Sequence, residues 1–318
     1  MKIQQVRNAT LLVDYAGAKF LIDPFLADKG TYAPFPNSLR QEQKNPLVNL
    51  PIPLEEVVKA DAVIVTHLHL DHWDEAAADT LAKDIPLFTQ NEDDAAEIKK
   101  LGFTQVHVLD SETRFKDIQL IKTAGEHGRG EILALAGSVC GVVFKHPTEN
   151  TLYIAGDTVW YPEVEKTILK YAPAVIVVNA GDNQFLQGGS LVMGKADVQK
   201  TAAAAPDATI IASHMEAVNH WTLSRQELRA FLQVNGLDKQ VLVQRKDAKG
   251  GTAVKSQLDL AGKTVWIVKD SPMRERVEAL SREIGDTIHI QTENSYGPEQ
   301  LFLKVVTGEI NFAVINSH

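Results

Sequence analysis

The sequence predicts an α/β fold, a four-layer αββα sandwich in which two β-sheets pack face to face between helices, followed by a small C-terminal αβα unit. Helices and strands alternate through residues 74–109, and antiparallel hairpins flank that stretch at residues 10–23 and 113–155. Alternation of this kind builds sheets covered by helices, and hairpins add antiparallel strands to them. A second alternation of strands and helices over residues 258–315 predicts the smaller unit.

The elements can be placed in order along the chain. Residues 27–53 carry five prolines and little periodicity, and an irregular loop of this length is uncommon within a compact domain. Either a flap over a functional site or a surface excursion accounts for it. A short helix at 54–59 then leads into the apolar strand 63–65. The other predicted elements are helices at 74–83, 92–101, 195–204 and 223–235, and strands at 86–89, 105–109, 113–123, 138–145, 151–155, 174–179, 209–213 and 240–243.

The composition is that of a soluble globular protein, because 44% of the 318 residues are hydrophobic and 23% are charged. The formal net charge of −9 disfavours polyanionic substrates. The one cysteine, Cys140, lies in an apolar run where a buried thiol is expected. Neither a signal peptide nor an apolar run of membrane-spanning length is evident, so cytoplasmic localisation is expected. The predicted partner is a small-molecule substrate, with neither nucleic acid nor membrane.

Residue types that bind metals cluster directly after the strand 63–65. His67 and His69 alternate along extended backbone and therefore point the same way, which lets two neutral imidazoles converge on one ion. Asp71 and His72 follow where the strand must turn, and a carboxylate and a third imidazole there can serve a second ion. A polar loop that merely holds histidines is the alternative. With 10 histidines in the whole chain, this spacing is rare by chance and indicates a metal site.

This His-x-His-x-Asp-His pattern after a buried strand resembles the metallo-β-lactamase superfamily, whose αββα sandwich carries a dinuclear metal site at its rim. The resemblance implies further ligands downstream. His127, bracketed by glycines, is similar to the third histidine ligand of the superfamily. Asp157, in a strand-Gly-Asp-Thr segment, is similar to the aspartate that bridges both metals through its two oxygens. His214, directly after strand 209–213, is similar to the last ligand.

Two other residues have alternative roles. Asp23, which precedes a proline after the hairpin, is either a turn residue or a carboxylate that orients a metal-bound histidine. His220 belongs to the same motif as His214 in the branch that resembles ascorbate-6-phosphate lactonase, and we expect it to support a ligand or to face the substrate. The resemblance covers residues 1 to about 243.

The resemblance implies two divalent ions, and the His-rich donor set suits zinc, with manganese or iron as alternatives. Two close ions lower the pKa of a bridging water, giving a hydroxide at physiological pH, and polarise the bond to be cleaved. We expect Asp71 to hold this nucleophile and carry a proton to the leaving group, and His220 to act as an oxyanion donor or leaving-group acid. The ligands are assigned as His67, His69 and His127 for the first ion, Asp71, His72 and His214 for the second, and Asp157 as the bridge.

The predicted activity is metal-dependent hydrolysis of a small-molecule lactone, ester or amide. A phosphodiesterase that uses the same dinuclear site is the enzymatic alternative. A solute-binding or sensory module that acts through the C-terminal part is the alternative from another class. The predicted metal set is complete, whereas the C-terminal part holds only half of a binding cleft, and this difference favours the hydrolase.

Residues 241–318 resemble a different family. The segment 258–268 is similar to the entry into the second lobe of a family-3 extracellular solute-binding protein. The segment Gly308-Glu309-Ile310 is similar to the motif that closes that lobe. We therefore predict two abutting domains, 1–240 and 241–318, which share strand 241–243 and which natural recombination or a deliberate fusion would equally produce. The remaining predicted elements of the second domain are helices 272–283 and 297–306 and strands 287–290 and 310–315.

Overall fold

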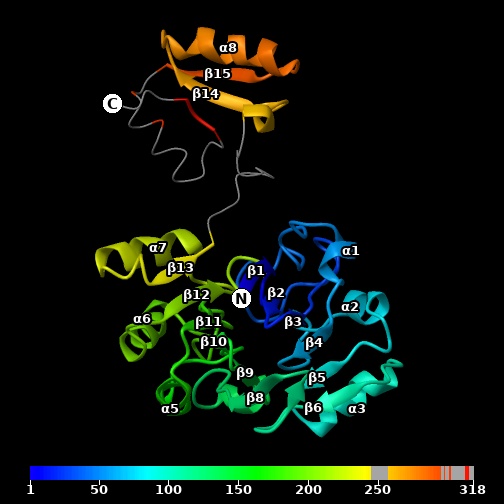
Figure 1. Ribbon diagram of the computed structural model, residues 1–318. Helices are drawn as coiled ribbons and strands as arrows, with labels where there is room; N and C mark the ends of the chain where they lie inside the picture. The colour runs from blue at the N-terminus through cyan, green and yellow to red at the C-terminus, as the bar shows by residue number, and fades with distance from the viewer. Residues whose placement is uncertain (245–256, 295–296, 298–300, 302–311, 315–318) are drawn as a thin grey trace. The chain divides into compact units, whose positions relative to one another are not determined.

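The computed structural model describes residues 1–244, 257–294, 297, 301 and 312–314 (Figure 1). Its contacts divide the chain into two units, Met1–Gln244 and Arg245–His318. The division therefore lies after Gln244 and not after Gln240. The reason is that Val241–Val243 form strand β13, which pairs in parallel with β12 (Thr209–Ser213) inside a sheet of the first unit.

The first sheet of this unit has six strands in the order of the chain, β1 to β6. The strands β1, β2 and β3 pair antiparallel, and β3 to β6 pair in parallel. The predicted hairpin is β2–β3, whereas β1 was not predicted from the sequence. The strands are β1 Lys2–Arg7, β2 Thr10–Tyr15, β3 Ala18–Ile22, β4 Ala62–Val65, β5 Leu87–Thr89 and β6 Val106–Val108.

The second sheet has seven strands in the order β13-β12-β11-β10-β9-β8-β7. From β7 to β10 neighbouring strands pair antiparallel, and from β10 to β13 they pair in parallel. The parallel strands of each sheet end at one edge, so the loops that leave them lie near one another. The remaining strands are β7 Arg114–Phe115, β8 Ile118–Ala124, β9 Cys140–His146, β10 Glu149–Ile154 and β11 Val175–Asn179.

Strand β4 shows how the layers are built. Its residues Ala62 and Ile64 face the core between the two sheets, while Val63 and Val65 face the core beneath the helices α1 to α3. A strand that is buried on both faces is apolar at every position, which explains the unbroken apolar run in the sequence. These helices are α1 Leu54–Val57, α2 Glu75–Thr80 and α3 Glu92–Lys100.

Three further helices cover the outer face of the second sheet (Figure 1). Val164, Val198 and Leu228, one from each helix, pack in one core with Ile176 and Ile210 of the sheet. The predicted four-layer αββα sandwich is confirmed, although α2 is shorter than predicted and α5 was not predicted. The helices are α5 Pro162–Tyr171, α6 Lys195–Ala204 and α7 Arg225–Val234.

The proline-rich loop 27–53 is anchored by Asn219, which is fully buried. The Asn219 side-chain oxygen accepts from the Phe35 amide at 2.8 Å and from Asn45 Nδ2 at 2.9 Å. Its amide nitrogen donates to Ser38 Oγ and to the Leu39 carbonyl oxygen, both at 2.8 Å. Because these bonds hold Phe35 beside His220, with ring centroids 4.6 Å apart, the loop is a flap over this part of the molecule.

In the second unit, the described residues form a strand–helix–strand motif. Strands β14 (Thr264–Val268) and β15 (His289–Glu293) pair in parallel and are joined by α8 (Met273–Ile284). Val265, Val277, Leu280 and Ile288 form its core. Most of the predicted helix 297–306 and strand 310–315, with Gly308-Glu309-Ile310, lie outside the described residues. The resemblance to a solute-binding lobe stays a prediction.

Within the described residues, no helix is both long enough and apolar enough to cross a membrane. Cys140 is fully buried between the sheets, as predicted, and burial raises the pKa of its thiol to about 12.

Candidate metal centre

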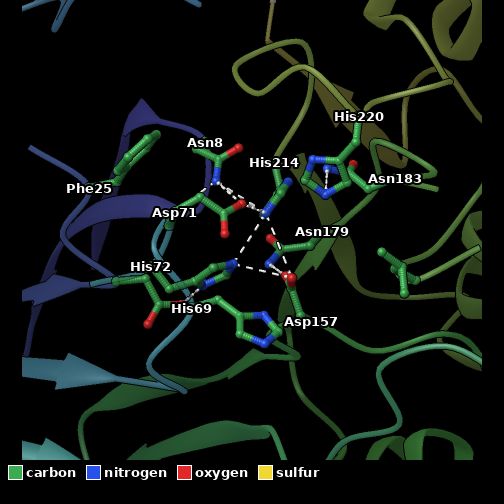
Figure 2. A network of polar contacts seen from close by, with 12 residues as sticks. Asn8, Phe25, His69, Asp71, His72, Asp157, Asn179, Asn183, His214 and His220 are labelled. Carbon is green, nitrogen blue, oxygen red and sulfur yellow. Dashed lines mark hydrogen bonds and ion pairs between the residues drawn. The ribbon is translucent and has the colours of Figure 1, made fainter. Parts of the chain in front are cut away.

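The predicted metal-binding residues meet where strands of both sheets end. His67, His69, Asp71 and His72 follow β4, in the first sheet. The others follow strands of the second sheet, and Figure 2 shows His69, Asp71, His72, Asp157 and His214 converging from the two sides. All seven are buried or half-buried, although the chain segments that carry them are far apart in sequence. In the second sheet, His127 follows β8, Asp157 follows β10 and His214 follows β12.

Three of the histidines form a first donor group. His69 Nδ1 lies 3.0 Å from His67 Nε2 and 3.3 Å from His127 Nε2. One ring nitrogen from each of the three lies within 4.8 Å of the others. The predicted convergence of His67 and His69 is therefore present, and the loop after β8 brings His127 to the same point.

A second donor group consists of Asp71, His72 and His214. His214 Nε2 lies 3.1 Å from Asp71 Oδ2 and 3.2 Å from His72 Nε2. Asp157 lies between the groups, with its Oδ2 at 3.2 Å from His72 Nε2, 3.6 Å from His127 Nε2 and 3.7 Å from His214 Nε2. This placement gives one carboxylate oxygen contact with residues of both groups.

The two carboxylate oxygens of Asp157 have different surroundings. Oδ1 accepts a hydrogen bond from Asn179 Nδ2 at 2.6 Å, and the bridging of two ions by the two oxygens stays a prediction. Only Oδ2 faces both donor groups. The preceding Gly156 has a φ of +70°, and a Cβ there would overlap the Cys140 carbonyl oxygen. Position 156 therefore requires glycine, because any side chain there would clash with the backbone of Cys140.

Asp23 has the orienting position and is not only a turn residue. Its Oδ1 accepts from the Thr66 amide at 2.7 Å, and its Oδ2 accepts from Thr66 Oγ1 at 2.8 Å. The same Oδ2 lies 2.9 Å from His72 Nδ1, which must donate because a carboxylate only accepts. Thr66 Oγ1, whose hydrogen is used on Asp23, accepts in turn from His67 Nδ1 at 3.1 Å. One carboxylate thus sets the proton positions of two imidazoles.

The first donor group fits a metal ion by its hydrogen-bond balance. Because Nδ1 of His67 donates to Thr66 and Nδ1 of His127 donates to the Leu191 carbonyl oxygen at 2.9 Å, each neutral ring presents the lone pair of Nε2 to the centre. Both lone pairs point at His69 Nδ1, which can donate at most one hydrogen. A cation among the three nitrogens satisfies all of them, so the residues present suit a bound divalent ion.

The charges of the centre also favour a cation. Burial lowers the pKa of His67 well below its ordinary value, so this imidazole is neutral. Burial acts to raise the pKa of Asp157, but the charges of His72 and His214 hold it well below its usual range. Burial likewise opposes the upward shift at His72, whose pKa is nevertheless raised because Asp157 and Asp23 favour a positive charge there. These carboxylates attract positive charge to the centre, and a divalent ion supplies it.

Sequence reasoning missed the amide side chains around the centre. Asn8 Nδ2 lies 3.0 Å from Asp71 Oδ2 and 3.1 Å from His214 Nε2, and Asn8 has a φ of 54° in the turn between β1 and β2. An asparagine in a turn is ordinary, so only the prediction of strand β1 could have drawn attention to it. Asn179, at the end of β11, has a clearer signal because it follows an apolar strand as Asp157 and His214 do.

His220 lies beside the donor groups and not among them. It lines a cavity of about 220 Å³ together with His69, Asp71 and Asp157. Burial lowers the pKa of His220 to about 4, which keeps the ring neutral. Asn183 Nδ2 lies 3.1 Å from its Nε2, so the ring proton is on Nδ1, which has no hydrogen-bond partner (Figure 2). With the proton there, His220 has an N–H group without a partner, and its predicted role toward a substrate stays a prediction.

Comparison with known proteins gives consistent results. Residues 18–215 match the family described as beta-lactamase superfamily domain. The chain is 58% identical over 245 residues to the UPF0173 protein YddR of Bacillus subtilis (strain 168), which covers 76% of this chain and 96% of the relative.

Two solved structures are also similar. An isothiocyanate hydrolase from Delia radicum gut bacteria is 44% identical with a TM-score of 0.74, over 77% of this chain and 96% of that protein. A possible metal-dependent hydrolase from Veillonella parvula DSM 2008 is 39% identical with a TM-score of 0.74, over 76% of this chain and 96% of that protein. With the fold and the His/Asp centre described above, these matches identify the chain as a metal-dependent hydrolase that belongs to the β-lactamase superfamily.

Proposed function

We propose that the protein hydrolyses a small, uncharged molecule at an electrophilic carbon, with two divalent ions held by the centre described above. The observation that carries this proposal is the pair of neighbouring donor groups, with Asp157 between them, whose members His69, Asp71 and His127 line a cavity that is otherwise apolar apart from Asp157 and His220. When bound, two neighbouring divalent ions supply a hydroxide at neutral pH and polarise the substrate. The His-rich donor set suits zinc.

The proposed ligands follow the observed groups. His67, His69 and His127 would hold one ion, and Asp157, which lies near residues of both groups, would be shared between the two ions. The second ion would be held by Asp71, His72 and His214.

Two residues of the chain act on protons in this proposal. Asp71 lines the cavity, and the nearby His214, His72 and His220 hold its pKa well below its usual range although burial opposes this. It is therefore a carboxylate that can accept a proton from the attacking water and deliver it to the leaving atom. His220, with its free Nδ1–H, donates a hydrogen bond to negative charge that develops on the substrate. Its neutral state favours this role over that of a leaving-group acid.

The cavity lining favours carbon electrophiles over phosphodiesters. Apart from the polar residues of the centre and His220, the cavity lining is apolar, formed by Phe35, Leu70, Leu135, Ala136, Phe185 and Leu191. Among the described residues, no lysine or arginine lines this cavity, whereas phosphate recognition commonly uses such side chains.

The relative that is 44% identical is named as an isothiocyanate hydrolase, so isothiocyanates are the first substrates to test, beside the predicted lactones, esters and amides. In isothiocyanate hydrolysis, the oxygen of water adds to the central carbon and one proton of the water goes to nitrogen. The C–N bond of the resulting thiocarbamate then breaks as nitrogen takes the second proton, and an amine and carbonyl sulfide are released. The carbon attacked is electrophilic and carries no net charge, as the cavity requires.

The test is elemental analysis of the purified full chain, followed by a panel of isothiocyanate, lactone, ester, amide and phosphodiester substrates. We expect about two divalent ions per chain and turnover of a carbon electrophile. Protein that holds no metal, and that gains neither activity nor thermal stability when zinc or manganese is added, would refute the proposal. Turnover of the phosphodiester alone would replace it with the phosphodiesterase alternative.

His214 and His220 are expected to respond differently to substitution. His214→Ala removes a proposed ligand, so the metal content should fall. His220→Ala removes the proposed hydrogen-bond donor, which is not a proposed ligand, so the metal content should stay at the wild-type value while kcat falls about 100-fold. Metal analysis and kinetics on the same preparations separate the two effects. Loss of metal from His220→Ala with retention in His214→Ala would invert the assignment.

A further inference from the structure

A small apolar cluster stands at the rim of the metal centre, apart from the main cores. It consists of Ile132, Ala136 and Leu191, with Phe185 packed against them, and we call it the rim cluster. Ile132 and Ala136 belong to α4 (Ile132–Ala136), a helix not predicted from the sequence. The backbone of the loop after β11 lies close to this helix, because a Cβ built on Gly188 would meet the Ile132 side chain at 3.1 Å. The rim cluster is therefore a packed wall.

Two cavities lie on either side of this wall. The inner cavity, of about 220 Å³, is lined by His69, Asp71, His127 and Asp157, and the outer cavity has a volume of about 460 Å³. Leu135 and Phe185 line both cavities, which are therefore adjacent. Leu135 is 81% exposed and Leu186, on the outer cavity, is 67% exposed. Large apolar side chains that stay exposed around a hollow mark a ligand-binding surface.

The outer cavity has no charged lining residue among those that the structure describes. Its polar lining side chains are Asn37 and Gln187, and the rest of the lining is apolar. A cavity of about 150 Å³ is sufficient for a benzene molecule. The inner cavity is only moderately larger and must also hold the reacting group, so a substrate with a ring needs the outer cavity as well. Size and lining thus indicate an uncharged, apolar occupant.

We infer that the outer cavity binds an apolar side chain of the substrate, aromatic or branched aliphatic, while the reacting group lies in the inner cavity. Leu135 and Phe185 are the specificity-determining residues, since each contacts both parts of such a molecule. The inference rests on the proposed function for the position of the reacting group. It deepens that proposal by naming the substrate class, a compact electrophile attached through a short linker to an apolar group.

The test compares two thiols that differ only by a phenyl ring, propane-1-thiol and 3-phenylpropane-1-thiol, because sulfur is a ligand of zinc and anchors each probe at the metal centre. Calorimetry on the zinc-loaded full chain gives both dissociation constants. We expect the ring to tighten binding about 10-fold or more, the range observed for apolar groups in fitted pockets. In Leu135→Gln and in Leu186→Gln, this gain should fall to about 2-fold or less.

Leu169→Gln is the matched control, because Leu169 is 70% exposed on α5 and lines neither cavity. It should keep the wild-type gain. The inference is overturned if the ring gives no gain in the wild-type protein, if neither thiol binds, or if Leu135→Gln and Leu186→Gln keep the full gain. Since both substituted leucines are largely exposed, the variants are expected to fold, and their melting temperatures check this.

Propyl and 3-phenylpropyl isothiocyanate then separate the inference from the proposed function. A ring preference in thiol binding that depends on Leu135, together with no hydrolysis of any carbon electrophile, would leave the inference standing and the proposed function refuted. Hydrolysis of both isothiocyanates with equal kcat/KM, unaffected by Leu135→Gln, would support the proposed function and refute the inference.

Discussion

Replacing His69 by alanine is expected to remove most of the bound metal and to lower kcat/KM by more than about 100-fold, since even the loss of an outer partner of a ligand costs about 10–100-fold. His69 Nδ1 is the atom toward which the lone pairs of His67 and His127 converge. Without His69, the first donor group keeps only two nitrogen ligands, those of His67 and His127. Metal content by elemental analysis and kinetics on the same sample measure the effect.

The control for this substitution is His107→Ala. His107 is an exposed histidine on β6 and belongs to neither donor group. It should leave metal content and activity at wild-type values. If His69→Ala retains its metal and its activity, the first donor group is not a metal site, and the proposed function fails with it.

Asp23→Asn is expected to weaken metal binding about 10–100-fold although Asp23 is not a proposed ligand. An amide has the size of the carboxylate, but one of its two terminal atoms is a donor. That donor must face either the Thr66 amide or the Nδ1–H of His72, both of which donate to Asp23 in the wild-type protein. If His72 yields, its proton moves to Nε2, the atom that faces the centre, and the ring can no longer bind an ion there.

Competition with a metal chelator measures this change in affinity without reference to activity. Asp79→Asn, an exposed change on α2, is the matched control and should have the wild-type affinity. Thermal unfolding without metal separates a local effect from a general loss of stability. An affinity unchanged in Asp23→Asn would mean that the carboxylate is only a structural element of the turn.

Much of the fold could be predicted because its signals are local. The apolar run of β4 and the His-x-His-x-Asp-His segment are adjacent in sequence, so the strand and its polar end are recognised together. Strand β1 is less legible because only its last residues, Val6 and Arg7, are buried, and it carries polar residues at Gln4 and Gln5. Helix α4 has five residues and no side-chain cap, so it shows neither a helical periodicity nor a capping residue by which the sequence could predict it.

The surroundings of the metal centre could not be predicted because they depend on tertiary contacts. Asn8 reaches Asp71 across 63 residues of sequence, and Asn219 reaches Phe35 across 184. An asparagine in a loop has the same appearance in sequence whether it is solvated or buried in such a network. Of the Thr66–Asp23–His72 arrangement, the sequence indicates only Asp23, because the link from Asp23 to His67 through Thr66 depends on the folded chain.

The anchored flap has a consequence for the rate at which substrate is captured. Loops that fold over a ligand only after it arrives lose conformational entropy at that moment, which weakens binding and slows productive encounter. Here Asn219 holds Phe35, Ser38, Leu39 and Asn45 in place through buried or partly buried hydrogen bonds that involve no ligand. The flap is therefore ordered during folding, before a substrate binds. The entropic cost of ordering it lowers the free energy of unfolding of the protein and does not weaken substrate binding.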